Sequence, residues 1–345
     1  MESSLVLGTA VVSLAGLIMG SSPWPLKLMR AFKFEQFALI AMFVALFVLP
    51  WAVTLLLCPE PLEALRDIPL GAIVKANLFS MSWGIAQVLA MLCFVRVGVS
   101  ITYGILAAVG AAIGVITPMV VKASGVFQEA PGLISQAGVT VLLGTVVMVV
   151  GVAFAARAGF GREKLQDSSV RPSGGFAMGL AMVVIAGVLS VGWGFAFAYS
   201  QEPVKEAMLA HGAGDLPASI AVWAVGLAGA GVVNVVYPAF LLTKRGTWSV
   251  FAENPRDIGL SVLYGVFFFL PSVLLGQGML MLGPLGASVG WGVVQGTLIL
   301  GGQFLGFVSG EWRGVHGAPR VQIYVAIAIL VVAMLILAVG NALAG

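Results

Sequence analysis

Amide side chains inside long apolar segments are the residues of this sequence best suited to binding chemistry. They are Asn77, Gln87, Asn234, Gln277, Gln295 and Gln303. An amide both donates and accepts hydrogen bonds, so it suits a ligand rich in hydroxyl groups. Polar groups are costly in apolar surroundings, and they indicate either a cavity or pathway or a hydrogen bond to a neighbouring helix.

Aromatic side chains occur in the same segments and could stack against the apolar face of a sugar. They are Trp83, Tyr103, Trp193, Trp223 and Trp291. Alternatively, such residues form a belt at the membrane interface. Trp83 and Gln87 are four residues apart and share a helix face, as do Trp291 and Gln295, and we expect the two pairs to bracket a ligand. The predicted substrate-binding residues are Trp83, Gln87, Tyr103, Trp193, Gln277, Trp291, Gln295 and Asn77.

Ionisable side chains avoid the middle of the apolar segments. No Asp or Glu lies there, which argues against a relay of carboxylates across a membrane. A partly desolvated carboxylate near a segment end could still carry a proton, although a solvated charge is the simpler interpretation. Lys75 lies about a turn inside its segment, where its side chain could reach outward to lipid headgroups. The candidate proton-coupling residues are Glu35, Lys75, Glu202 and Glu311.

The remaining reactive side chains form no recognisable catalytic or metal site. Cys58 and Cys93 lie in different segments, and His211 and His316 stand apart. This spacing predicts no disulfide framework, no metal ligand set and no activated nucleophile, so we expect neither an enzyme nor a bound cofactor. The net charge of +3 is spread over short connectors, which argues against nucleic-acid binding.

The segments that must position these residues are apolar and long enough to cross a membrane. Of the 345 residues, 60% are hydrophobic and 9% are charged, against about 25% charged in a soluble domain. We therefore predict an all-α integral membrane protein with ten transmembrane helices. The predicted spans are 4–22, 37–57, 70–94, 99–121, 132–156, 174–200, 216–242, 258–282, 288–309 and 321–343.

Basic residues alternate between the two sides of the predicted membrane. The odd-numbered connectors carry 13 of the 17 Lys and Arg residues, whereas the even-numbered ones carry three. Because cytoplasmic loops are enriched in Lys and Arg, the odd connectors are expected to face the cytoplasm. Both termini then face outward, which requires an even number of spans.

The two halves of the sequence resemble each other weakly. A shift of 188 residues aligns Gly98, Ser100, Tyr103, Gly104 and Gly114 with Gly286, Ser288, Trp291, Gly292 and Gly302, and a shift of 171 aligns Gly8, Ala10, Ala15 and Gly16 with Gly179, Ala181, Ala186 and Gly187. We predict a five-helix repeat over 1–156, a cytoplasmic linker over 157–173 and a second repeat over 174–345. Since five is odd, the second repeat is inverted, an arrangement typical of alternating-access transporters.

Short motifs distributed along the chain resemble those of the L-rhamnose/proton symporter family within the drug/metabolite transporter superfamily. They are Pro25–Lys27, Leu49–Trp51, Trp83–Ile85, Arg96–Gly98, Ala156–Gly159, Gly301–Gly302 and Glu311–Trp312. The resemblance implies ten helices, a periplasmic N-terminus and uptake of a 6-deoxy sugar across a bacterial inner membrane, with the proton gradient as energy source. The chain departs from the family's more polar pattern at Ala86–Ala90, and it also differs between Tyr264 and Gln295.

Those departures fall where a substrate cavity would be expected, so other interpretations stay open. One is an exporter or exchanger of amino acids or other small metabolites on the same superfamily scaffold. A second is a facilitator that moves its substrate without proton coupling. A third is a receptor that binds without transport.

Overall fold

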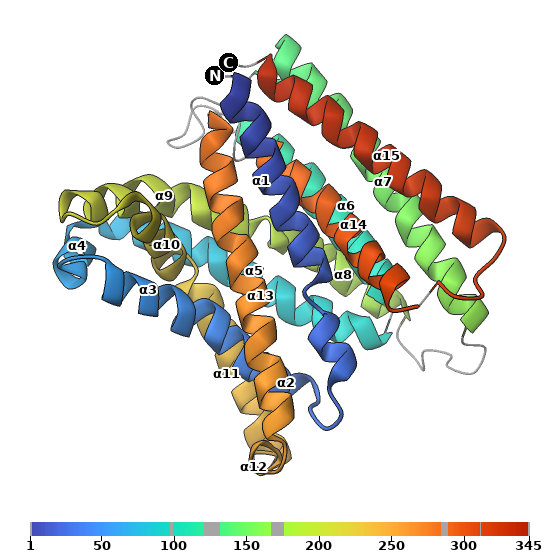
Figure 1. The fold of residues 1–345 in the computed structure, drawn as a ribbon, viewed down its shortest axis with the longest axis horizontal. Coiled ribbons are helices and arrows are strands. Elements are labelled where there is room, and N and C mark those ends of the chain that lie inside the picture. The colour runs from blue at the N-terminus through green and yellow to red at the C-terminus, as the bar shows by residue number, and fades with distance from the viewer. Residues whose placement is uncertain are drawn as a thin grey trace. The chain divides into compact units, whose positions relative to one another are not determined.

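The computed structural model describes residues 2–96, 99–120, 132–166, 176–283, 289–310 and 312–343, and every regular element in these ranges is a helix. The helices are α1 (Glu2–Ser21), η1 (Trp24–Leu28), α2 (Phe34–Phe43), η2 (Val44–Val48), α3 (Leu49–Leu57), α4 (Pro61–Asp67), α5 (Leu70–Arg96), α6 (Val99–Val120), α7 (Gln136–Gln166), α8 (Phe176–Ser190), α9 (Gly192–Ala210), α10 (Asp215–Gly226), α11 (Ala228–Arg245), α12 (Val250–Glu253), α13 (Pro255–Met281), α14 (Trp291–Val308) and α15 (Ala318–Ala342) (Figure 1).

Length and apolar composition make many of these helices able to cross a membrane. Among the described residues, eight candidate spans are present, and a ninth is added if the bent pair α10 and α11 counts as one span. The prediction of an all-helical membrane protein is therefore confirmed. The fourth predicted span coincides with α6, whose described apolar part, Ile105–Thr117, is too short to count. The total of ten spans and the inverted repeat stay predictions.

Two predicted spans differ in detail from the helices observed. The span predicted over 216–242 is broken at Leu227, where α10 and α11 meet at 50°. The span predicted over 174–200 is interrupted at Val191 and continues as α9 to Ala210. In addition, α7 continues to Gln166, into the residues predicted to form the linker. Periodicity of apolar residues alone does not reveal such breaks, because Gly-rich segments remain apolar across them.

The chain forms two compact units, each of which draws on both halves of the sequence. Unit 1 comprises Met1–Ser21, Val88–Val191 and Gln277–Gly345, and unit 2 comprises Ser22–Gln87 and Gly192–Gly276. Helices α5 and α13 contribute residues to both units. The predicted boundaries at 156 and 174 describe the sequence repeat and are not tested by this grouping.

Unit 1 is packed along two helix pairs that small residues bring close. Helix α15 lies beside α7, and α1 lies against α14 (Figure 1). A Cβ atom on Gly20 would overlap the Leu298 carbonyl, and one on Gly301 would overlap the Leu17 carbonyl. Only glycine permits this approach of α1 to α14, as is common where helices associate within a membrane.

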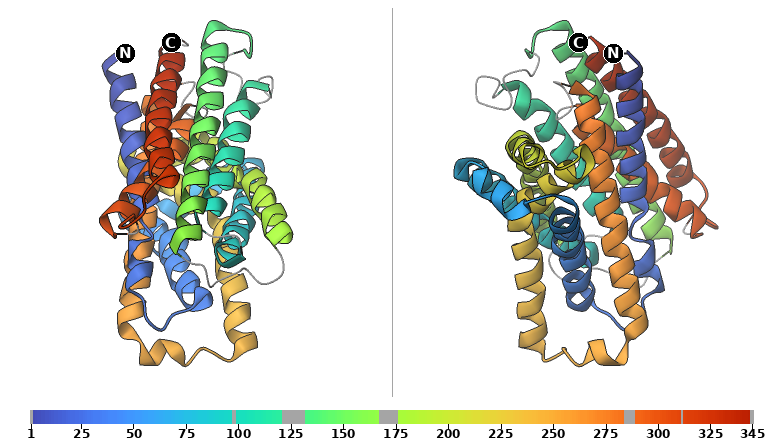
Figure 2. Two further views of the ribbon diagram at one scale, coloured as in Figure 1. Left: turned by 90° about the vertical axis from the view of Figure 1, so that its right-hand side faces the viewer. Right: turned by 60° about the vertical axis from the view of Figure 1, so that its left-hand side comes forward.

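Unit 2 contains the two segments α2–η2–α3 and α9–α10–α11, together with the first parts of α5 and α13. Helix α2 packs against α11, and α10 packs against α9 and α3. The short helix α12 joins the ends of α11 and α13, as both views of Figure 2 show. The Asp257 carboxylate at the start of α13 accepts hydrogen bonds from the backbone N–H groups of Arg30, Ala31 and Phe32, which fixes the loop before α2.

Candidate functional site

Three aromatic rings from three helices form a stack in unit 2. The Trp83 ring of α5 lies 5.2 Å from that of Trp193 of α9 and 5.9 Å from that of Phe268 of α13, measured between ring centroids. The Trp193 and Phe268 rings are 6.1 Å apart with an interplanar angle of 17°. All three side chains are buried, so the stack is a packed element of unit 2.

Further aromatic rings extend this stack in two directions. Trp223 of α10 lies 5.9 Å from Trp193 and stacks on Phe197 at 4.8 Å. On the other side, Tyr264 stacks on Phe268 at 6.2 Å. The contacts link α5, α9, α10 and α13 through a continuous set of rings, which we call the aromatic stack.

Gly192 at the start of α9 allows the rings of Trp83 and Trp193 to come into contact. A Cβ atom on Gly192 would overlap the Phe79 carbonyl and the Ser82 hydroxyl of α5. The backbones therefore approach more closely than any other residue would allow. Because Trp193 directly follows Gly192, the approach brings its ring onto Trp83. The sequence predicted both tryptophans as binding residues, and the structure brings them together.

Two amides bind backbone groups at positions where helices are broken or tightly packed. The Asn77 side chain donates to the carbonyls of Ile73 and Val225 and accepts from the Gly229 N–H, so it fills the break between α10 and α11. The Asn234 amide donates to the carbonyls of Ala230 and Gly84. The contacts of Asn77 use both of its N–H groups and one acceptor position of its oxygen, so little of this amide is left for a ligand.

The remaining predicted binding residues fall in both units. Gln87 is half-buried at the end of unit 2, and Gln277 is half-buried in unit 1. Trp291 and Gln295 are buried in unit 1, where the Trp291 indole donates to the Gly110 carbonyl at 3.2 Å. The side chain of Tyr103 lies outside the described residues. The two Trp and Gln pairs belong to different units, and their facing arrangement stays a prediction.

The four proton-coupling candidates differ sharply in their surroundings. Glu35 of α2 is 1% exposed, and its Oε1 atom accepts a hydrogen bond of 2.8 Å from Arg245 at the end of α11. Its Oε2 atom is buried and has no hydrogen-bond partner among the described residues. Lys75 is exposed, with its Nζ atom 5.7 Å from the centroid of the Tyr199 ring, and Glu202 is exposed as well. Glu311 lies outside the described residues.

Sequence reasoning missed several partners of these residues. Phe268 is one of three consecutive phenylalanines, Phe267–Phe269, and nothing in the sequence shows which of them faces the tryptophans. In the sequence Arg245 is one of the 13 basic residues of the odd-numbered connectors, and nothing there indicates that it is the partner of Glu35. Both contacts join segments that are far apart in the chain, so local spacing carries no signal of them.

A surface cluster at the ends of α4 and α9 contains the described residues that come nearest to a metal site. Ligand-type atoms of Glu60, Glu63 and His211 lie within 4.8 Å of one another. The His211 ring, however, already contacts Asp67 at 2.8 Å through Nε2 and Glu60 at 3.3 Å through Nδ1. The hydrogen bond with Asp67, followed by that with Glu60, raises the pKa of His211 above its ordinary value. The geometry is that of a protonated histidine between two carboxylates.

Comparison with known proteins identifies the family. The model of the L-rhamnose-proton symport protein (RhaT) family matches residues 1–344. L-rhamnose-proton symporters of Escherichia coli O1:K1 / APEC and of Citrobacter koseri are each 25% identical to the chain, over 92% of its length and 93% of theirs. The L-rhamnose-proton symporter of Cronobacter sakazakii is 26% identical over 92% of each chain. The chain therefore belongs to the L-rhamnose-proton symport protein family, whose members are membrane transporters and not enzymes.

Proposed function

We propose that this protein is a secondary active transporter that takes up a sugar together with protons, and that the sugar is L-rhamnose or a similar 6-deoxy sugar. The observation that carries the proposal is the family match over residues 1–344. The protein resides in a bacterial inner membrane with both termini in the periplasm. Its ten helices form two inverted five-helix repeats that provide alternating access.

The aromatic stack is the proposed sugar-recognition element of unit 2. A 6-deoxy sugar carries a methyl group in place of a hydroxymethyl group, so it offers an aromatic ring a larger apolar face than a hexose does. Trp83 provides this ring, and Gln87, one helical turn further along α5, provides hydrogen bonds for sugar hydroxyls. Trp83 is 4% exposed, so the sugar binds to a conformation in which one ring of the stack has moved aside.

Glu35 is the proposed proton carrier, because it is the buried carboxylate among the described candidates. Its Oε2 atom can accept a proton, and the neutral carboxyl then releases the guanidinium of Arg245. Loss of the proton restores the ion pair. The cycle links proton binding to the contact between α2 and α11 within unit 2. Breaking this contact can therefore shift the equilibrium between two conformations of the protein.

Contacts between connectors support the proposed topology. In unit 2, residues of the first connector contact residues of the seventh, through Glu35 with Arg245 and through Arg30 with Asp257. His211 of the sixth connector contacts residues of the second. Odd connectors therefore meet odd ones and even connectors meet even ones, as two sides of a membrane require.

Transport into proteoliposomes tests the proposal. With an inward proton gradient, labelled L-rhamnose is expected to accumulate, and a protonophore is expected to abolish the accumulation. Uptake without gradient dependence would indicate a facilitator, and binding without flux would indicate a receptor. If L-rhamnose neither accumulates nor stabilises the protein against heat while an amino acid does, the exchanger hypothesis replaces this one.

Two variants test the assigned residues. Trp83→Ala is expected to raise the KM for the sugar at least tenfold, whereas Trp248→Ala, at an exposed tryptophan of the loop before α12, leaves it unchanged. Glu35→Gln is expected to abolish gradient-driven accumulation and to retain exchange of sugar across the membrane. Glu253→Gln, at an exposed carboxylate of α12, serves as its control.

A further inference from the structure

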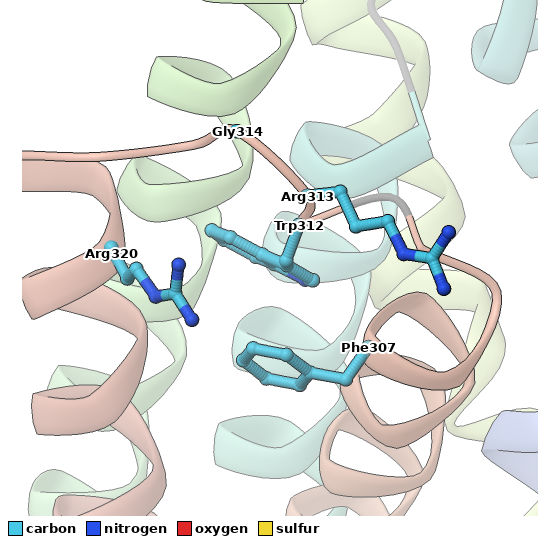
Figure 3. Close-up of a pocket in the computed structure, with 5 residues that line it drawn as sticks. All are labelled: Phe307, Trp312, Arg313, Gly314 and Arg320. Carbon is cyan, nitrogen blue, oxygen red and sulfur yellow. The ribbon is translucent and has the colours of Figure 1, made fainter.

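A cavity of about 330 Å³ opens in unit 1 at the loop between α14 and α15. Its lining residues include neither Glu35 nor any member of the aromatic stack. It is lined by Phe307, Trp312, Arg313, Gly314 and Arg320 (Figure 3). None of these lining residues is acidic. The cavity adjoins the ends of two candidate spans, Trp291–Val308 and Ala318–Gly340, so it lies at the level of the lipid headgroups.

Aromatic rings form the rigid part of this cavity. The Phe307 ring stacks on Trp312 at 5.4 Å and on Tyr324 at 6.1 Å. The Arg162 guanidinium of α7 lies 5.2 Å from the centroid of the Trp312 ring. A cation over an indole face is attracted to it, so this contact holds a further positive charge beside the cavity.

The hydrogen-bonding groups of the cavity are donors. Arg320 uses Nε for the Tyr324 hydroxyl at 3.3 Å and Nη1 for the Val315 carbonyl at 3.5 Å, and its guanidinium has further N–H groups. Trp312 is 2% exposed, yet its indole Nε1 has no hydrogen-bond partner among the described residues. A buried N–H without a protein acceptor, in a residue that lines the cavity together with Arg313 and Arg320, is suited to an anionic acceptor.

We propose that this cavity binds the phosphate group of an anionic phospholipid. Guanidinium groups match phosphate oxygens in a forked geometry, and the indole N–H provides an additional donor. The loop is the ninth connector and Arg162 belongs to the fifth, and both connectors are predicted to face the cytoplasm. On that side of a membrane, basic pockets between transmembrane helices bind anionic headgroups. A lipid in this place joins the ends of α7, α14 and α15.

Binding of lipid to the purified full-length protein in detergent tests the proposal. Phosphatidylglycerol is the probe, phosphatidylcholine is the zwitterionic comparison, and inorganic phosphate is the free anion. Native mass spectrometry counts bound lipid, and thermal unfolding reports its stabilisation. We expect phosphatidylglycerol to bind at least tenfold more tightly than phosphatidylcholine.

Variants locate the site. Arg313→Gln combined with Arg320→Gln is expected to remove the preference for phosphatidylglycerol, and Trp312→Phe, which keeps a ring against Phe307, is expected to weaken it. Arg256→Gln, at an exposed arginine of unit 2, is the matched control and keeps the preference.

Three results would overturn the proposal. The first is equal binding of both lipids. The second is a preference that survives in the double variant while its unfolding temperature matches that of the unmodified protein. The third is inorganic phosphate that stabilises the protein as much as phosphatidylglycerol and displaces it, because the ligand would then be a free anion.

Discussion

The ion pair between Glu35 and Arg245 allows an asymmetric prediction about stability. The Glu35 side chain is 1% exposed, whereas that of Arg245 is 52% exposed. Removing the arginine leaves a buried carboxylate without a counter-charge, but removing the glutamate leaves an arginine that water can solvate. Arg245→Met should therefore destabilise the protein more than Glu35→Gln does.

The size of the difference follows from burial. Breaking a fully buried pair by removing one partner costs about 3–5 kcal/mol. Because Arg245 is half-exposed, water replaces part of its interaction, and we expect Arg245→Met to cost about 2 kcal/mol. Glu35→Gln buries an amide donor without a partner and should cost about 1 kcal/mol. In the double variant no buried carboxylate is left for the missing arginine to neutralise, so the cost should also be about 1 kcal/mol.

Equilibrium unfolding of the four proteins in detergent, followed by tryptophan fluorescence, measures these differences. Lys244→Met is the matched control, because it removes a neighbouring cation from the same last turn of α11 and should cost about 0.3 kcal/mol. The reasoning is refuted if Arg245→Met destabilises no more than Lys244→Met does. It is equally refuted if the costs of the two single variants add up in the double variant.

Three further predictions concern pH, packing and the break in α10 and α11. Because the pKa of His211 is raised in the folded state, its protonated ring stabilises the protein at acidic pH. This contribution is lost as the pH rises through the raised pKa. Between about pH 5 and pH 8 the unfolding temperature should therefore fall less in His211→Gln than in the unmodified protein. Gly301→Ala should lower the unfolding temperature strongly, because its methyl group meets the Leu17 carbonyl, whereas Gly259→Ala, with open space around it, should not. Asn77→Leu removes three hydrogen bonds to backbone groups and should cost about 2–3 kcal/mol in denaturant unfolding, and an unchanged midpoint would contradict this role for Asn77.

Much of the helical architecture could be predicted from the sequence, because a membrane span must be long, apolar and internally hydrogen-bonded. The breaks at Val191 and Leu227 could not be predicted in the same way, since they depend on contacts with α5. Asn77 occupies one break, and the close approach of Gly192 to α5 follows the other. Hydropathy does not change at either place.

The candidate site was partly predictable for a related reason. Trp83 and Trp193 stood out because large aromatic and polar side chains are unusual choices deep in a span, and the structure stacks them. The amide of Asn77 stood out equally, but it serves the fold by binding backbone groups. Residue type identifies the polar groups that need a hydrogen-bond partner in an apolar environment. Only the tertiary structure shows whether the protein provides that partner or leaves it to a ligand.

The grouping of the chain into two units bears on the predicted repeat. The first half of the chain passes from unit 1 to unit 2 after Ser21 and returns to unit 1 after Gln87. The second half passes from unit 1 to unit 2 after Val191 and returns to unit 1 after Gly276. The matching points differ by 170 residues (191 less 21) and 189 residues (276 less 87). The sequence alignment of the halves needs shifts of 171 and 188 in the same order. Two repeated halves would be expected to exchange units at corresponding positions, as these do, and the repeat itself stays a prediction.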